Sequence, residues 1–177
     1  MVTLILLRFM ATWRGHHRLE RKLASILLGA ITVAEAGVTS LIVTDILDTS
    51  SRLIDVSPHV AQMFLRDAML VWLMNILTFA IWYWEIDGNG PTSRHLDGYQ
   101  LTDLLFPQST IAPGGAREKP WEPNFIDYLF VAFTTSTTFG PTDTSLLSVR
   151  MKILTMVQAT ISMAVLVVIV AWALSVL

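Results

Sequence analysis

The strongest constraint on the fold is the stretch at residues 153–177, which contains no charged side chain. A helix needs about 20 mostly apolar residues to cross a bilayer. Residues 23–44 form a second such stretch, in which Glu35 is the one ionisable residue, and residues 63–84 form a third. We therefore predict an all-α integral membrane protein with three transmembrane helices.

The overall composition supports a membrane protein. Hydrophobic residues make up 53% of the chain and charged residues 15%, whereas soluble domains carry about 25% charge. The net charge of -2 gives no reason to expect a nucleic-acid partner. The absence of cysteine excludes disulfides and Cys-ligated metals. Because no catalytic, phosphate-binding or metal motif is present either, we predict that the protein is not an enzyme, has no cofactor and has the lipid bilayer as a partner.

The first 22 residues form a basic segment. Five of them are Arg or Lys and one is Glu, so we expect residues 1–22 to lie on the membrane surface. Residues 23–62 should contain the first transmembrane helix and a polar connection interrupted by Pro58. Residues 85–124 hold several Gly and Pro residues and cannot form one helix.

The segment before the last span is unusual. Residues 125–133 are apolar and helical in character, but they are too few to cross a membrane, and residues 134–143 are rich in hydroxyls. Gly140 and Pro141 then interrupt any helix. This order predicts a re-entrant loop, in which non-helical backbone is buried in protein or lines a water-filled cavity. An interfacial helix followed by a Thr/Ser-rich turn is the alternative.

A resemblance to a known family follows from these residues. Residues 137–143 (Thr-Thr-Phe-Gly-Pro-Thr-Asp) align without gaps with the Thr-Thr-Val-Gly-Tyr-Gly-Asp filter of tetrameric potassium channels. More broadly, the chain from about residue 65 to 177 resembles a family of small bacterial membrane proteins with an ion-channel-type pore domain. The filter residues implied are Thr137, Thr138, Phe139, Gly140, Pro141, Thr142 and Asp143.

The resemblance implies an architecture and a function. Residues 63–177 would be a pore-type domain containing an outer helix, a turret at 85–124, a pore helix at 125–136, the filter, and an inner helix at 150–177. The implied function is monovalent cation conduction of potassium type through a homotetramer in a bacterial inner membrane. A non-conducting scaffold or accessory subunit that keeps the pore-loop fold is the competing class.

The segment also departs from the channel pattern. Thr142 stands in place of the second filter glycine, and Pro141 stands in place of the tyrosine that anchors the filter to the pore helix. These departures favour a shorter or less selective filter, or a scaffold that no longer conducts. Gly140 is then the one filter position at which we expect a residue without Cβ to be needed.

Polar residues of the last helix share one face. Thr155, Gln158 and Ser162 are spaced at i, i+3 and i+7, and the same face continues with Leu166 and Ile169. We predict these five residues to line a pore with a wet cavity and a hydrophobic constriction. Hydrogen bonds across helix interfaces explain the polar residues equally well.

Other polar residues have simpler explanations. For Glu35, an intramembrane carboxylate, we favour a packing or pairing role, either protonated or paired with Arg66. Asn75 should form an interhelical hydrogen bond, and Asp127 should stabilise the start of its helix. We expect Trp82, Tyr83 and Trp84 to anchor their helix at the membrane–water interface. The acids of residues 85–124 would form either a negative vestibule or a solvated loop: Glu85, Asp87, Asp97, Asp103, Glu118 and Glu122.

The predicted orientation contains a conflict. The basic residues 1–22 predict a cytoplasmic N-terminus, and three spans would then place residues 85–124 inside the cell. A pore of potassium-channel type requires that segment outside and residue 177 inside. We favour the pore orientation, because the order of elements is more specific than five basic residues.

Overall fold

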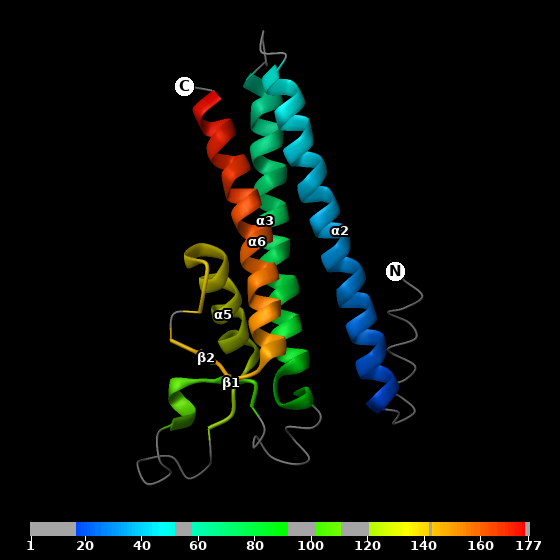
Figure 1. Ribbon diagram of the computed structural model, residues 1–177, viewed down its shortest axis with the longest axis vertical. Coiled ribbons are helices and arrows are strands. Elements are labelled where there is room, and N and C mark those ends of the chain that lie inside the picture. The colour runs from blue at the N-terminus through cyan, green and yellow to red at the C-terminus, as the bar shows by residue number, and fades with distance from the viewer. Residues whose placement is uncertain (1–16, 52–57, 92–101, 111–120, 142, 176–177) are drawn as a thin grey trace.

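The computed structural model describes most of the chain (Figure 1). The described residues are 17–51, 58–91, 102–110, 121–141 and 143–175. The predictions for residues 1–16 and for Thr142 lie outside this part.

Three long helices run side by side and form the body of the molecule (Figure 1). They are α2 (His17–Ser51), α3 (Pro58–Ile86) and α6 (Val149–Ser175). Their segments Ser25–Thr44, Leu65–Asn89 and Val149–Val170 are long and apolar enough to cross a membrane. This confirms the prediction of a helical protein with three candidate spans.

The helix ends follow from local sequence. Pro58 is the first residue of α3, a position where its missing N–H costs nothing and its fixed φ suits the helix. Helix α2 already begins at His17. Residues 17–22, which we expected in a surface segment, are therefore continuous with the first spanning helix.

Short elements lie between α3 and α6. They are η1 (Asp87–Asn89), β1 (Leu104–Leu105), η2 (Pro107–Thr110), α5 (Phe125–Thr138) and β2 (Ser145–Leu146). Strands β1 and β2 pair in antiparallel orientation, with Leu104 opposite Leu146. Helix α3 ends in a tight turn, where Gly88, Asn89 and Gly90 have φ values of 57°, 62° and 90°. Glycine and asparagine tolerate this left-handed backbone best.

Helix α5 has a well-defined start. The Asn124 side chain accepts a hydrogen bond from the N–H of Ile126 at 2.8 Å, and the N–H of Asn124 donates to Asp127 at 2.7 Å. This reciprocal capping box satisfies backbone groups that the first turn leaves unpaired. The role predicted for Asp127 at the helix start is thus confirmed.

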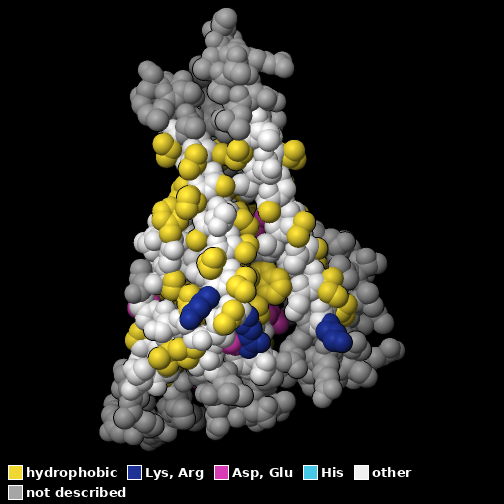
Figure 2. Space-filling view, viewed as in Figure 1, with side chains coloured by type: hydrophobic (Ala, Val, Ile, Leu, Met, Phe, Trp, Pro, Cys, Tyr) yellow, Lys and Arg dark blue, Asp and Glu magenta, His cyan; other side chains and the backbone are white. Residues whose placement is uncertain are grey.

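The core lies where α3, α5 and α6 meet. Phe79, Tyr83, Tyr128 and Met151 are fully buried there, and Tyr128 packs edge-on against Phe106 with ring centroids 5.5 Å apart. Most side chains of the spans are half-buried or exposed. Figure 2 shows hydrophobic side chains along the described height of this face, with the Lys and Arg side chains visible on it confined to its lower part.

Candidate functional site

The segment from α5 to β2 begins beside the end of α3. The Tyr128 hydroxyl donates to Asp87 Oδ2 at 2.7 Å. The other carboxylate oxygen of Asp87 accepts from the N–H groups of Asp103 and Leu104, at 2.7 and 3.1 Å. Asp87 therefore ties the first turns of α5 and strand β1 to one end of the helical body.

The far end of α5 reaches the middle of the two neighbouring spans. The Ser136 hydroxyl is hydrogen-bonded to Ser162 at 2.9 Å and donates to Asn75 Oδ1 at 3.4 Å. Ser162 also donates to Asn75, at 2.8 Å. At about 1.5 Å per residue, Asn75 and Ser162 lie ~20 Å from the ends of their spans nearest the β-strands. The interhelical role predicted for Asn75 is confirmed.

The chain then returns to the end where α5 began. Strand β2 pairs with β1, and the N–H of Leu147 donates to the carbonyl of Asp103 at 2.9 Å. Figure 1 shows α5 rising beside α3 and α6, and the following segment descending again to β2.

The first two predicted filter residues lie inside α5. The helix runs to Thr138, two positions beyond the expected end at residue 136. The Thr137 hydroxyl donates to the carbonyl of Phe133 at 3.0 Å. The Thr138 hydroxyl donates to the carbonyls of Thr134 and Gly140, at 2.7 and 2.9 Å. These hydroxyls bond the backbone of the segment itself.

The following predicted filter residues are non-helical and largely uncovered. Phe139 and Asp143 are exposed, and Gly140 and Pro141 are half-buried. The left-handed residue is Phe139, with φ of 62°. Gly140 has no such φ, and a Cβ built on it meets nothing within 4 Å. Within a single chain, therefore, nothing requires Gly140 to lack a Cβ, and the expectation for an assembled filter stays a prediction.

The polar residues predicted to line a pore are buried between helices instead. Gln158 donates to the carbonyl of Ala132 at 2.8 Å and to Ser136 at 3.0 Å, and it accepts from the Tyr83 hydroxyl at 2.5 Å. Thr155 and Ser162 are also buried. This differs from the predicted pore-lining role, because the face of α6 that carries them is covered by α3 and α5.

The continuation of that face is partly covered as well. Leu166 and Ile169 are half-buried, and Ile169 packs against the small cluster of Ala68, Val165 and Val168. The side of α6 left exposed carries other side chains, which are mostly apolar: Ile153, Met156, Val157, Thr160, Met163, Val167 and Val170.

An ion pair stabilises the base of the returning segment. Arg150 donates to both carboxylate oxygens of Asp103, with Nε 2.8 Å from Oδ1. Burial acts to raise the pKa of Asp103, but hydrogen bonds from Arg150 and Ser148 and the positive charge of Arg150 outweigh it. The pKa of Asp103 is therefore lowered from its ordinary value.

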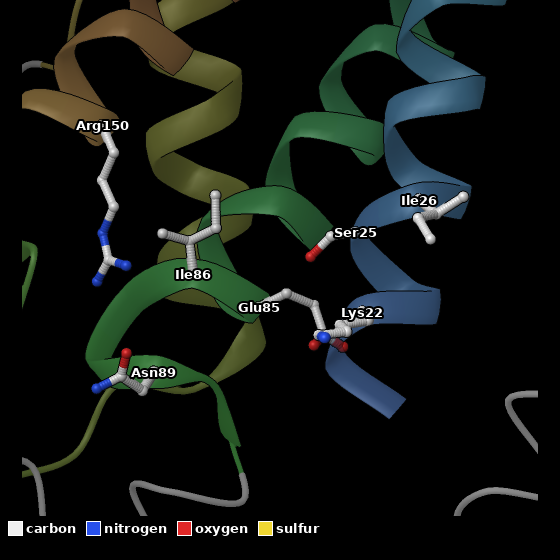
Figure 3. A pocket seen from close by; sticks show the side chains of 7 residues that line it. All are labelled: Lys22, Ser25, Ile26, Glu85, Ile86, Asn89 and Arg150. Atoms are coloured by element: carbon white, nitrogen blue, oxygen red, sulfur yellow. The ribbon is translucent and has the colours of Figure 1, made fainter. Parts of the chain in front are cut away.

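A pocket opens near this ion pair, between α2, α3 and α6 (Figure 3). It measures about 570 Å³ and is lined by Lys22, Ser25, Ile26, Glu85, Ile86, Asn89 and Arg150. Lys22 and Glu85 point toward one another across it (Figure 3), and Arg150 is bonded to Asp103. These charges compensate each other, so the pocket offers no concentrated charge to an ionic ligand.

Two acids of the predicted vestibule serve structural roles. Asp87 and Asp103 are buried and hydrogen-bonded, whereas Asp97 and Glu118 lie outside the described residues. Among the residues that the structure describes, no three His, Cys, Asp or Glu side chains are grouped to hold a metal ion.

The aromatic anchor and the possible pairing of Glu35 with Arg66 differ from expectation, whereas Glu35 is buried and bonded to Thr78 as a packing role requires. Tyr83 is fully buried in the core, and Trp82 donates to Thr32 on α2 at 3.0 Å. Arg66 pairs with its neighbour Asp67, so it is not the partner of Glu35. Sequence reasoning missed Tyr83 because its flanking tryptophans suggested a membrane interface. The signal was the Tyr83 hydroxyl itself, because a hydroxyl within a run of apolar residues indicates a buried hydrogen-bond partner.

Comparisons with known proteins add no assignment. Protein-family models, curated proteins and solved structures give no match.

Proposed function

We propose that the chain is one subunit of a homotetrameric pore-loop channel for monovalent cations in a bacterial inner membrane. The observation that carries the proposal is the path of the segment from α5 to β2. It starts at Asp87, reaches the level of Asn75 and Ser162, and returns to Asp103. In a bilayer this path would be a re-entrant loop.

The exposure at the tip of the loop supports assembly around a pathway. Thr138 and Phe139 are exposed at the level of mid-span, and the backbone that follows is non-helical. Non-helical backbone at membrane depth requires cover by protein or water. Neighbouring subunits around an aqueous pathway provide both, and a single loop encloses no pathway.

Two features of α5 suit a cation. Its C-terminal end points toward mid-span, and the C-terminus of a helix carries partial negative charge. The returning residues 139–141 add backbone carbonyls, which replace the hydration shell of an ion in channel filters. An exposed apolar row on α5, formed by Ile126, Phe130 and Phe133, is available for a neighbouring subunit or lipid.

One observation favours the alternative of a non-conducting scaffold. The Thr138 hydroxyl, which would face an ion, instead donates to the carbonyls of Thr134 and Gly140. Four bonded residues around Ser136 also hold the loop firmly against α3 and α6: Asn75, Tyr83, Gln158 and Ser162.

Stoichiometry and flux test the proposal together. Protein in lipid nanodiscs should be tetrameric, and proteoliposomes should pass potassium or thallium. Thr138→Val should change the potassium-to-sodium flux ratio several-fold while the tetramer persists. Thr44→Val is the matched control, because this exposed hydroxyl bonds only its own helix, at Leu41. A stable monomer in lipid, or absence of cation flux through intact tetramers, would favour the scaffold.

A further inference from the structure

The candidate for a separate site is Glu35, which lies between α2 and α3 and takes no part in the pore loop. Its side chain is 7% exposed. It sits near the middle of the span Ser25–Thr44. The Thr78 hydroxyl donates to Glu35 Oε1 at 2.6 Å. Within the described part of the chain, the other oxygen, Oε2, is buried and has no hydrogen-bond partner.

Among the side chains that the structure describes, none that is charged faces this carboxyl from the elements packed against it. On α3 the flanking charged positions are Asp67 and Glu85, ~17 and ~10 Å along the helix from Thr78. Arg66 is paired with Asp67. On α2 itself the flanking charged positions are Lys22 and Asp45, both more than ~10 Å from Glu35 along the axis.

Helix α6 supplies no countercharge either. Within its span Val149–Val170 the charged residues are Arg150 and Lys152. Both lie in its first turns, and Arg150 shares a pocket with Lys22 at the start of α2. Glu35 lies more than three turns further along α2 than Lys22. The described charges therefore all lie near the ends of the spans, away from Glu35.

A second buried oxygen lies one helical turn from Glu35. Thr39 is 5% exposed, and its buried hydroxyl has no hydrogen-bond partner among the described residues. Thr32 and Thr44 on the same helix donate to carbonyls of α2, at Leu28 and Leu41. The neighbourhood of Glu35 thus offers hydroxyl groups and no cation.

An ionised carboxylate in such a place costs far more free energy than a neutral one. We propose that Glu35 is a proton-binding site, which holds its proton at neutral pH and so keeps α2 packed on α3. Loss of the proton would leave an uncompensated charge between the two helices. This proposal is independent of cation conduction.

The lipid-soluble reagent dicyclohexylcarbodiimide tests for the proton directly. The carboxyl oxygen adds to the central carbon of the reagent while the carboxyl proton moves to a reagent nitrogen. The acyl group then migrates from oxygen to the other, unprotonated nitrogen of the reagent and gives an N-acylurea, whose N–H keeps the transferred proton. No atom leaves, so the labelled peptide gains the whole mass of the reagent.

Mass spectrometry of the full-length protein in liposomes measures this adduct. We expect Glu35 to be labelled at pH 7 at least ten-fold faster than the exposed Glu122, with labelling that declines toward alkaline pH. Glu35→Gln should carry no adduct on that peptide. Labelling of Glu35 no faster than that of Glu122, or a rate unaffected by pH, would overturn the proposal.

Stability against pH gives an independent readout. Thermal unfolding of wild-type protein in detergent should occur at lower temperature as the pH is raised from neutral to alkaline. Glu35→Gln keeps an oxygen to accept from Thr78 and has no proton to lose, so its pH dependence should be clearly smaller. An identical pH dependence of the two proteins contradicts the proposal.

Discussion

Gln158 provides the sharpest test of how the loop is held. This fully buried side chain joins three helices, because it bonds Tyr83 of α3 and both Ala132 and Ser136 of α5 from its position on α6. Gln158→Leu removes all three hydrogen bonds while keeping a side chain of similar volume. The Tyr83 hydroxyl then keeps a longer contact with Thr155, at 3.4 Å.

The size of the effect follows from these bonds. Hydrogen bonds between helices in membrane proteins contribute ~0.6 kcal/mol each on average, so the loss of three should destabilise the protein by about 2 kcal/mol. This corresponds to roughly a 30-fold change in the ratio of folded to unfolded protein. We expect that loss in equilibrium unfolding in mixed detergent micelles, followed by tryptophan fluorescence.

Two further variants make the test specific. Thr160→Val, on the exposed side of the same helix, removes a hydroxyl that bonds its own helix at Met156, and its cost should be near zero. Tyr83→Phe combined with Gln158→Leu should cost less than the sum of the two single changes, because the partners share one bond. If Gln158→Leu costs no more than Thr160→Val, the inferred network does not hold the loop.

Three other predictions concern the two ends and the tip of the loop. The pKa of Asp103 is lowered from 3.8, so its pair with Arg150 contributes stability that is complete above about pH 4 and is lost as the pH falls through the lower folded value. Acid unfolding scans should show this loss in wild type and not in Asp103→Asn. Asn124→Ala should destabilise the protein by about 1 kcal/mol through loss of the cap of α5, measured by thermal or denaturant unfolding. Gly140→Ala should destabilise the protein by less than about 1 kcal/mol. Phe139→Gly should stabilise the protein by about 1 kcal/mol, because the backbone of Phe139 is left-handed. Unfolding measurements that give the opposite order of stabilities contradict the assigned turn.

The sequence predicted the spans well because the signal for them is additive. Each apolar stretch contains enough hydrophobic residues to identify it without knowledge of its neighbours, and α2, α3 and α6 contain all three. The capping role of Asp127 was predictable for a similar reason, since its partner Asn124 lies three residues away. A pattern within a few neighbouring residues is therefore enough to predict the structure of that segment.

The partners of the polar residues were not predictable in the same way. Thr155, Gln158 and Ser162 share a face of their helix whether that face meets water or another helix. Whether that face meets water or protein depends on Tyr83 and Ser136, which lie in distant parts of the chain. Periodicity defines which side chains lie together and does not identify the surface opposite them.

The turn after α5 shows the same limit on a smaller scale. The resemblance to a channel filter made Gly140 the position expected to need a residue without Cβ, yet Phe139 is the residue that takes the left-handed conformation. Thr138 accounts for part of this choice, because its hydroxyl donates to the carbonyls of both Thr134 and Gly140. These two bonds extend the helix through Thr138 and draw the Gly140 carbonyl back toward it. Reversal of the chain therefore begins one residue earlier than the glycine, and it leaves the Gly140 position open to a side chain.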